Sequence, residues 1–155
     1  MEINQIFQYW QWLEKKPLGV WLFNQLIPIV NPYTGALKAR VVKIEAGFAR
    51  VELKDRRGIR NHLKSIHAIA LTNLGEFSSG IALISLFKPN MRGIPKEIGI
   101  EFLKKARGKL TAECTTSIDD FTESLEHTVV AEIKDEDGDI VARVNVKWLL
   151  GYKKD

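Results

Sequence analysis

The sequence lacks the residues and motifs that several classes of site require. Its 155 residues hold one cysteine, Cys114, which excludes disulfide scaffolds and all multi-cysteine zinc or iron–sulfur sites and is compatible with a reducing compartment. No Gly-rich phosphate loop, Gly-x-Ser-x-Gly elbow or nucleotide fingerprint is present. No histidine pairs with a second histidine or a carboxylate at metal-ligand spacing, so we expect no metal and no cofactor.

Targeting and membrane-spanning patterns are also missing. The first residues show no basic region followed by an apolar run, so we expect no signal peptide. The apolar run 18–30 is short and is broken by Pro28, and the longer run 66–87 holds Glu76 and four polar residues near its middle. Such groups are costly inside a bilayer. We therefore expect a cytoplasmic protein without membrane contact.

Composition and charge describe an ordinary globular chain with an uneven charge distribution. Hydrophobic residues make up 45% and charged residues 27%, and the length suits one domain. The net charge of +4 conceals two basic segments, 38–64 and 88–109, and an acidic segment, 111–139. The basic segments either meet an anionic ligand or are simply solvated faces. The acidic segment argues against nucleic-acid binding.

Hydrophobic periodicity predicts two short helices, two strands, one long helix and four further strands. Alternation of apolar and polar residues indicates half-buried strands, and Asp137-Gly138 is a strong hairpin signal. Residues 31–35 have turn chemistry. The expected helices are 3–14, 18–30 and 66–87, and the expected strands are 37–44, 48–54, 98–102, 110–114, 129–133 and 140–148.

This order predicts an α+β fold, an antiparallel sheet of about six strands curled around one long helix. Small residues in 66–87 would let the sheet wrap closely around that helix. We expect residues 1–35 to form a helical extension and residues 36–155 the sheet-and-helix domain. Such a monomer exposes a sheet edge, so we expect a homodimer or a dimer of dimers.

Glu76 is the sole acidic residue of the long helix. Its neighbours in sequence are apolar, and Thr72 and Ser79 share its face at i−4 and i+3. A partly buried carboxylate in such a place has a raised pKa, which suits a general base.

The spacing of three residues around the start of this helix resembles that of a known family. Asn61 is followed six residues later by His67, and Glu76 comes nine residues after the histidine. With the segments 100–113 and 135–142, these positions resemble the hot-dog-fold thioesterase superfamily. The similarity is closest to its phenylacetyl-CoA thioesterase-like branch and to an uncharacterised subgroup with N-terminal helices. The resemblance covers roughly residues 35–150.

The resemblance implies a thioesterase that releases a carboxylic acid and a thiol from an acyl-CoA or another acyl thioester. Glu76, supplied by the other subunit, would be the base or the nucleophile, Asn61 would hold water or the carbonyl, and His67 would orient the site. The backbone at Ala68 and Ile69 would polarise the thioester carbonyl, and a tunnel beside the helix would take the acyl chain. Basic residues at the mouth would meet the phosphates of coenzyme A: Arg56, Arg57, Arg60, Lys64, Lys104, Lys105 and Arg107.

Other interpretations of the same residues stay open. The family has two glycines after the histidine where this chain has Ala68 and Ile69, which favours a non-catalytic binder of acyl ligands. A dehydratase of the same fold would pair His67 with Glu76. Asn61 also suits a turn or a helix cap. Cys114 alternates with apolar residues and is more simply a core residue than a nucleophile.

Overall fold

The computed structural model describes residues 5–153, which form six strands and four α-helices. Three helices come first: α1 (Ile6–Leu13), α2 (Gly19–Val30) and α3 (Pro32–Leu37). The long helix is α4 (Ala68–Ile84). The strands are β1 (Arg40–Glu45), β2 (Phe48–Leu53), β3 (Met91–Phe102), β4 (Leu110–Thr115), β5 (Ser124–Lys134) and β6 (Ile140–Tyr152).

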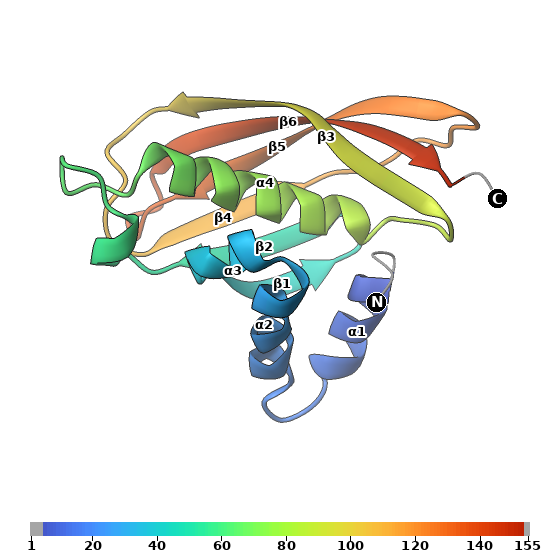
Figure 1. The fold of residues 1–155 in the computed structure, drawn as a ribbon, viewed down its shortest axis with the longest axis horizontal. Helices are drawn as coiled ribbons and strands as arrows, with labels where there is room; N and C mark the ends of the chain where they lie inside the picture. The colour runs from blue at the N-terminus through green and yellow to red at the C-terminus, as the bar shows by residue number, and fades with distance from the viewer. Residues whose placement is uncertain (1–4, 154–155) are drawn as a thin grey trace.

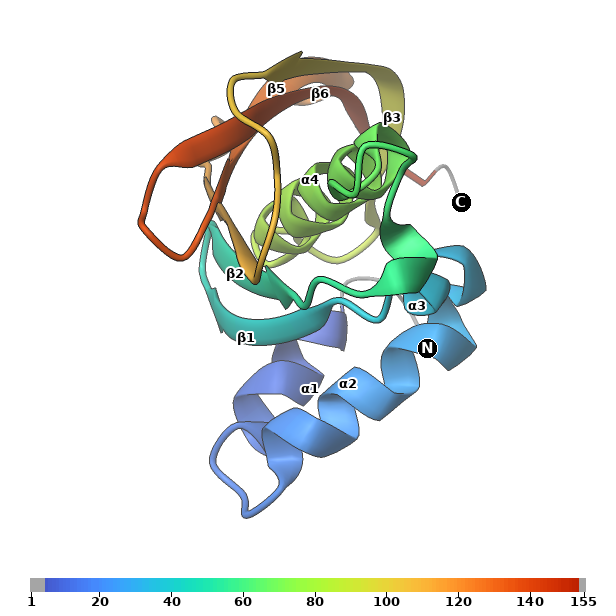
Figure 2. The same cartoon turned by 90° about the vertical axis from the view of Figure 1, so that its left-hand side faces the viewer.

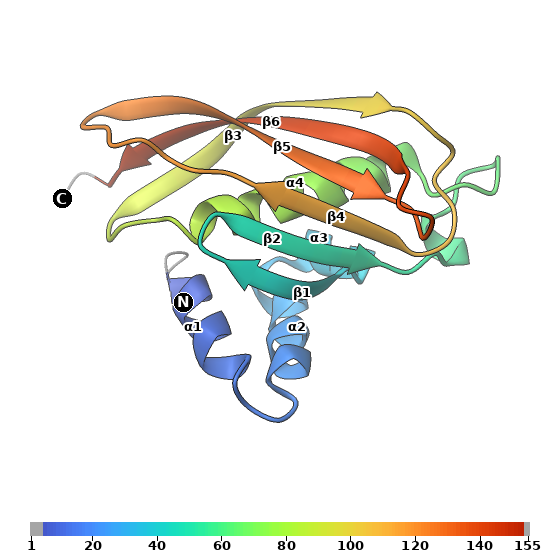
Figure 3. The same cartoon turned by 180° about the vertical axis from the view of Figure 1, so that it is seen from behind.

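The six strands form one antiparallel sheet in the order β1-β2-β4-β5-β6-β3, and the sheet curls around α4 (Figures 1 and 3). Alternate residues of β2, namely Ala49, Val51 and Leu53, are fully buried, as their spacing predicts. The predicted α+β architecture of one long helix inside a six-stranded sheet is therefore confirmed.

Small residues let α4 approach the sheet closely. A Cβ atom added to Gly75 would lie 2.3 Å from Cγ2 of Val144 on β6, nearer than any side chain tolerates. Ser78, Ser79 and Gly80 are buried on the same helix. The helix is therefore held at a depth that only glycine permits at position 75.

The N-terminal helices lie below the curled sheet, and α1 and α2 form a hairpin that projects from it (Figures 1 and 2). Asn24 fastens α2 to the outer edge of the sheet, because its Oδ1 accepts a bond of 2.7 Å from the Val41 amide and its Nδ2 donates one of 2.9 Å to the Val41 carbonyl. The Arg56 guanidinium donates to the carbonyls of Ala36 and Leu37 at the end of α3.

Several boundaries differ from those expected. The turn predicted at 31–35 is the start of α3, because the Asn31 side chain accepts a hydrogen bond from the Thr34 amide and Pro32 occupies the first helical position. The β3 and β5 strands begin earlier than their alternation indicated, at Met91 and Ser124. Residues 3–4 of the helix expected at 3–14 lie outside the described residues.

Strand β3 forms one edge of the sheet and is the most exposed strand. Ile94, Ile98 and Phe102 on it are largely accessible, although isoleucine and phenylalanine are usually buried. The chain thus presents an apolar sheet edge. None of the described helices has the length and hydropathy needed to cross a membrane.

Candidate active site

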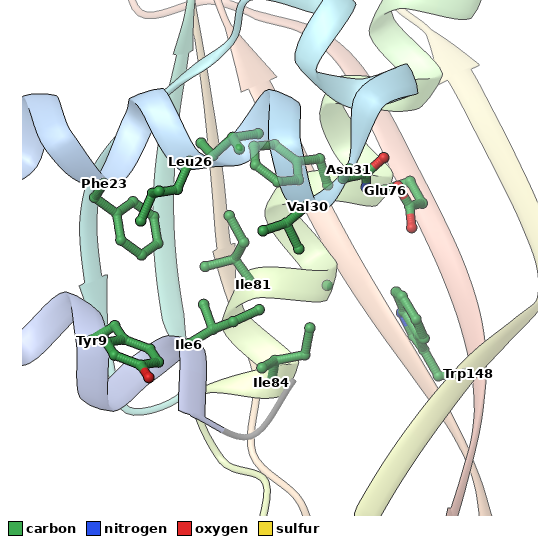
Figure 4. Close-up of a pocket in the computed structure, with 13 residues that line it drawn as sticks. Ile6, Tyr9, Phe23, Leu26, Val30, Asn31, Glu76, Ile81, Ile84 and Trp148 are labelled. Carbon is green, nitrogen blue, oxygen red and sulfur yellow. The ribbon is translucent and has the colours of Figure 1, made fainter. Parts of the chain in front are cut away.

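Glu76 lies on the wall of an apolar cavity between α4 and the N-terminal helices. The cavity has a volume of about 250 Å³. In Figure 4, Glu76 and Trp148 lie on one side of it, and Tyr9 and Phe23 lie on the other. Its lining comes from α1, α2, α4 and β6 and consists of Ile6, Tyr9, Phe23, Leu26, Ile27, Val30, Asn31, Glu76, Phe77, Gly80, Ile81, Ile84 and Trp148.

The Glu76 carboxylate has no partner of opposite charge. No residue of 5–153 gives it a hydrogen bond or an ion pair. The neighbouring hydroxyls are used elsewhere, since Thr72 donates to the Ala68 carbonyl and Ser79 to the Glu76 backbone carbonyl. Burial therefore acts unopposed and raises the pKa of Glu76 above its ordinary value. A carboxylate of this kind is a stronger base than one in water.

His67 caps the N-terminus of α4. Its Nδ1 accepts a hydrogen bond of 3.1 Å from the Ile69 amide, which fixes Nδ1 as the unprotonated ring nitrogen in this arrangement. The Ala68 amide meets no acceptor within the described part of the chain, so the helix end keeps a free donor and its partial positive charge. The side chain of Ile69 is mostly exposed.

Asn61 shapes the loop before α4. Its Oδ1 accepts hydrogen bonds from the amides of Leu63, at 2.9 Å, and Ser65, at 3.2 Å. This is the turn role that the sequence analysis kept open beside a catalytic one. Its Nδ2 group has no acceptor in residues 5–153 and remains available as a donor.

The two basic segments come together at the N-terminal end of α4. The Ile66 amide donates to the Ala106 carbonyl at 2.9 Å, and the Gly108 amide donates to Asp55 at 3.1 Å. Segment 55–66 therefore lies against segment 104–108, and the predicted basic residues share one region of the surface.

Four of the seven basic residues already have partners there. Arg60 pairs with Asp55, and this bond, at 2.6 Å, is the main reason that the pKa of Asp55 is lowered. The other three are Arg56, on the carbonyls after α3; Lys104, on Asp135 and Asp139; and Arg107, on the Leu63 carbonyl.

The remaining three, Arg57, Lys64 and Lys105, form no ion pair within residues 5–153. All three are exposed on this surface. They are therefore the cations most available to an anionic ligand.

Within one protomer the predicted catalytic residues fall into two groups. Asn61, His67, Ala68 and Ile69 lie together at the start of α4, whereas Glu76 lies nine residues along it. At 1.5 Å per residue, the His67 and Glu76 backbones are roughly 13 Å apart along the helix axis. The two groups meet in one site only if a second copy brings its own helix start to Glu76.

Sequence reasoning missed the cavity residues contributed by the N-terminal helices. These residues belong to helices that are apolar on more than one side, and the sequence pattern did not show which side of each helix would face Glu76. They are Tyr9, Phe23, Leu26 and Val30. The uncharged stretch that follows Lys16 was the available signal that this segment packs against the domain.

The other residues singled out in the sequence have structural surroundings. Cys114 is buried in the core, and burial raises the pKa of its thiol to about 12. Trp10 and Trp148 are buried, whereas Trp12 and Trp21 are exposed. Among residues 5–153, no three His, Cys, Asp or Glu side chains are grouped so that they would hold a metal ion.

Comparison with known proteins assigns the chain to a family. The model of a domain of unknown function, DUF4442, matches residues 19–150, from the start of α2 to all but the last two residues of β6. The chain belongs to the DUF4442 family. No curated protein matches the chain in sequence.

Solved structures share the fold of this DUF4442 chain. The structural-genomics protein APC5556 is 27% identical over 97% of this chain and 99% of its own, with a TM-score of 0.80. A probable thioesterase of Pseudomonas aeruginosa is 22% identical over 88% of this chain and 98% of its own, with a TM-score of 0.76. A mutant thioesterase of Staphylococcus aureus is 14% identical over 78% and 99%, with a TM-score of 0.69. These likenesses confirm the predicted hot-dog fold.

Proposed function

We propose that this DUF4442 protein is a cytoplasmic acyl-CoA thioesterase in which Glu76 is the general base. The observation that carries the proposal is the Glu76 carboxylate, unpaired and with a raised pKa, on the wall of an apolar cavity. A partly buried charge without a partner destabilises a fold, so its presence calls for a functional reason. The thioesterase-like proteins of the same fold support this choice of reaction.

The complete site needs two copies of the chain. Pairing of β3 with β3 of a second copy would cover the exposed Ile94, Ile98 and Phe102 and remove the open sheet edge. We infer that this homodimer brings Glu76 of one protomer to Asn61, His67 and the helix start of its partner. The separation of roughly 13 Å within one protomer then becomes a short distance across the interface.

The reaction follows from the groups so assembled. Glu76 takes a proton from a water molecule whose oxygen attacks the thioester carbonyl carbon. The Ala68 amide, aided by the positive end of α4, stabilises the oxyanion of the tetrahedral intermediate. The carbon–sulfur bond then breaks, and the proton held by Glu76 passes to the leaving sulfur. The Asn61 amide positions the water or the carbonyl, and His67 holds the first turn of the helix in place.

Coenzyme A would lie across the basic surface at the helix start. Arg57, Lys64 and Lys105 are free to pair with its phosphates, whereas Arg60 and Lys104 would first have to leave their carboxylate partners. We therefore assign the main phosphate contacts to the first three residues and supporting ones to Arg56, Arg60, Lys104 and Arg107.

The cavity beside Glu76 would take the acyl chain. A cavity of about 150 Å³ holds benzene, so one of about 250 Å³ holds roughly ten carbon atoms. Apart from Glu76 and Asn31, no charged or amide side chain lines it. We therefore propose a medium-length apolar acyl group, of about eight to ten carbons, as the preferred substrate.

One observation favours a non-catalytic acyl binder as the second candidate. The Ile69 amide, one of the two backbone donors expected at the thioester carbonyl, already donates to His67. The exposed Ile69 side chain also occupies a position where the thioesterases that the sequence resembles have glycine. In the binder, the ligand would occupy the same cavity without being cleaved.

Thiol release from a panel of short, medium, long and aromatic acyl-CoAs separates the two candidates. The thioesterase hydrolyses medium chains, and Glu76→Ala reduces kcat by at least about a hundredfold because it removes a positioned base. A binder is stabilised thermally by acyl-CoA but releases no thiol in either form. Absence of both turnover and stabilisation would refute the two functions together.

A further inference from the structure

Helix α2 has two apolar faces, and only one of them packs against the protein. Val20, Phe23 and Ile27 lie on the inner face, which contacts the core. Leu22 and Ile29 lie on the opposite side, at i and i+7, and Leu18 immediately precedes the helix as its N-cap residue. Leu18 is 74% exposed, Leu22 45% and Ile29 76%. A helix that is apolar all round is normally covered on all sides, so this face lacks its covering partner.

We call Leu18, Trp21, Leu22 and Ile29 the outer face of α2. Gln25 is the only polar residue among the exposed positions between Leu18 and Val30. The 21 residues from 17 to 37 include no Asp, Glu, Lys or Arg. An exposed stretch of this length without charge is unusual for a surface that faces water.

Unpaired cations border this outer face. Lys15 and Lys16 precede it in the loop between α1 and α2, and Lys38 and Arg40 line a hollow beside it together with Trp21. None of the four forms an ion pair within residues 5–153. From 5 to 43 the chain holds five Lys or Arg and one acidic residue, Glu14. The partner that covers this face must therefore be apolar and negatively charged at its rim.

The hairpin has the shape of an element that inserts into a surface. The loop between α1 and α2 lies far from the sheet in all three views (Figures 1, 2 and 3). Trp12 and Trp21 are exposed on the two helices of the hairpin, and the Lys16 ammonium lies 4.5 Å from the Trp12 ring. Tryptophan and lysine are the side chains that prefer the boundary between lipid and water.

A second copy of the chain fits this face poorly. In a two-fold interface the same patch meets itself, so the basic border of one copy would meet the basic border of the other. Lys15, Lys16, Lys38 and Arg40 would then repel their counterparts. An anionic lipid surface complements both parts of this face, because its acyl chains can cover the apolar centre and its phosphate groups can pair with the basic rim.

We propose that the outer face of α2, with Lys15 and Lys16, binds the surface of a membrane that contains anionic lipids. The helix lies in the interface and buries Leu18, Leu22 and Ile29 among the acyl chains, while the lysines pair with phosphate groups. The sequence analysis expected no membrane contact, and the exposed second face of α2 is what changes that expectation. Leu26 and Val30 both line the cavity and are exposed, so the cavity opens beside the bound face.

Sedimentation with lipid vesicles tests this binding independently of any hydrolysis. We expect the full chain to bind vesicles of phosphatidylcholine with phosphatidylglycerol at least tenfold more tightly than vesicles of phosphatidylcholine alone. Raised salt weakens the binding. Lys15→Gln with Lys16→Gln weakens binding to the anionic vesicles about tenfold or more and leaves the neutral ones unchanged.

A matched pair of leucines locates the binding face. Leu22 and Leu103 are both 45% exposed, but only Leu22 lies on the outer face of α2. Leu22→Glu should weaken vesicle binding at least tenfold, whereas Leu103→Glu should stay within twofold of the original chain, with both variants keeping its thermal midpoint.

Three results would overturn the proposal: no binding to anionic vesicles, equal losses in both leucine variants, or a molecular mass in solution that Leu22→Glu halves. The last result would show that a second copy covers the face. Because the readout is vesicle binding, any of these results leaves the thioesterase proposal standing, and a failed hydrolysis assay leaves this one standing.

Discussion

Replacement of Glu76 by glutamine should stabilise the protein while abolishing its activity. Glu76 is half-buried without a partner, and this burial raises its pKa in the folded state above its ordinary value. The folded state then binds more protons than the unfolded state at pH values between the two pKa values, so the wild type loses stability as the pH rises through this window. The glutamine of Glu76→Gln is neutral at every pH, so this variant loses no stability at position 76 as the pH rises.

The size of the gain follows from the size of the pKa shift. Each unit by which burial raises the pKa contributes about 1.4 kcal/mol to the difference in unfolding free energy at neutral pH. The difference should vanish below about pH 4, where the glutamate is protonated in both states. The lowered pKa values of Asp55 and Glu113 are common to both proteins and cancel in the comparison.

Urea unfolding at pH 7 and at pH 4 measures this difference directly. Glu123→Gln, at an exposed position, is the matched control and should change stability by less than about 0.5 kcal/mol. A Glu76→Gln variant less stable than the wild type at pH 7 would refute the reasoning, because it would mean that the carboxylate holds the fold together.

Three further predictions concern the cavity and the core. Leu26→Trp narrows the cavity and should shift the preferred acyl-CoA to a shorter chain. Leu22→Trp, one turn away and outside the cavity, is the control and should leave the preferred chain length unchanged. Rates of thiol release across the acyl-CoA panel measure both. Gly75→Ala forces a methyl group against Val144 and should lower the unfolding free energy by about 1–3 kcal/mol in urea titrations, whereas an unchanged midpoint would mean that α4 can move away from the sheet. Cys114, buried with a raised pKa, should react with a thiol reagent only after unfolding, and rapid reaction of the folded protein would contradict its burial.

The architecture was predictable because its patterns are local and periodic. Ala49, Val51 and Leu53 alternate as a half-buried strand must, and the small residues around Gly75 indicated a helix held close to a sheet. The spacing of Asn61, His67 and Glu76 resembles that of the hot-dog-fold thioesterases, and this resemblance predicted the fold from the sequence. The prediction was wrong locally at α3, where Asn31 and Pro32 begin a helix. Asparagine and proline are common both in turns and at helix N-termini, so the sequence pattern alone did not distinguish the two.

The cavity was not predictable, because it depends on how separate elements pack. Tyr9 and Leu26 belong to helices whose apolar residues occur on more than one side, so periodicity could not decide which residues face α4. The same ambiguity hid the outer face of α2, where Leu18 and Ile29 remain exposed. Both features arise from tertiary packing that a single sequence pattern does not encode.

Complementation between two inactive variants tests the central claim that one site is built from Glu76 of one protomer and the helix start of the other. Glu76→Gln and Asn61→Ala are each refolded alone and then together in equal amounts. With random pairing, half of all dimers are mixed, and each mixed dimer carries one intact site of two, so thiol release from octanoyl-CoA should return to about a quarter of the wild-type rate. A mixture no more active than the separate variants would contradict the shared site.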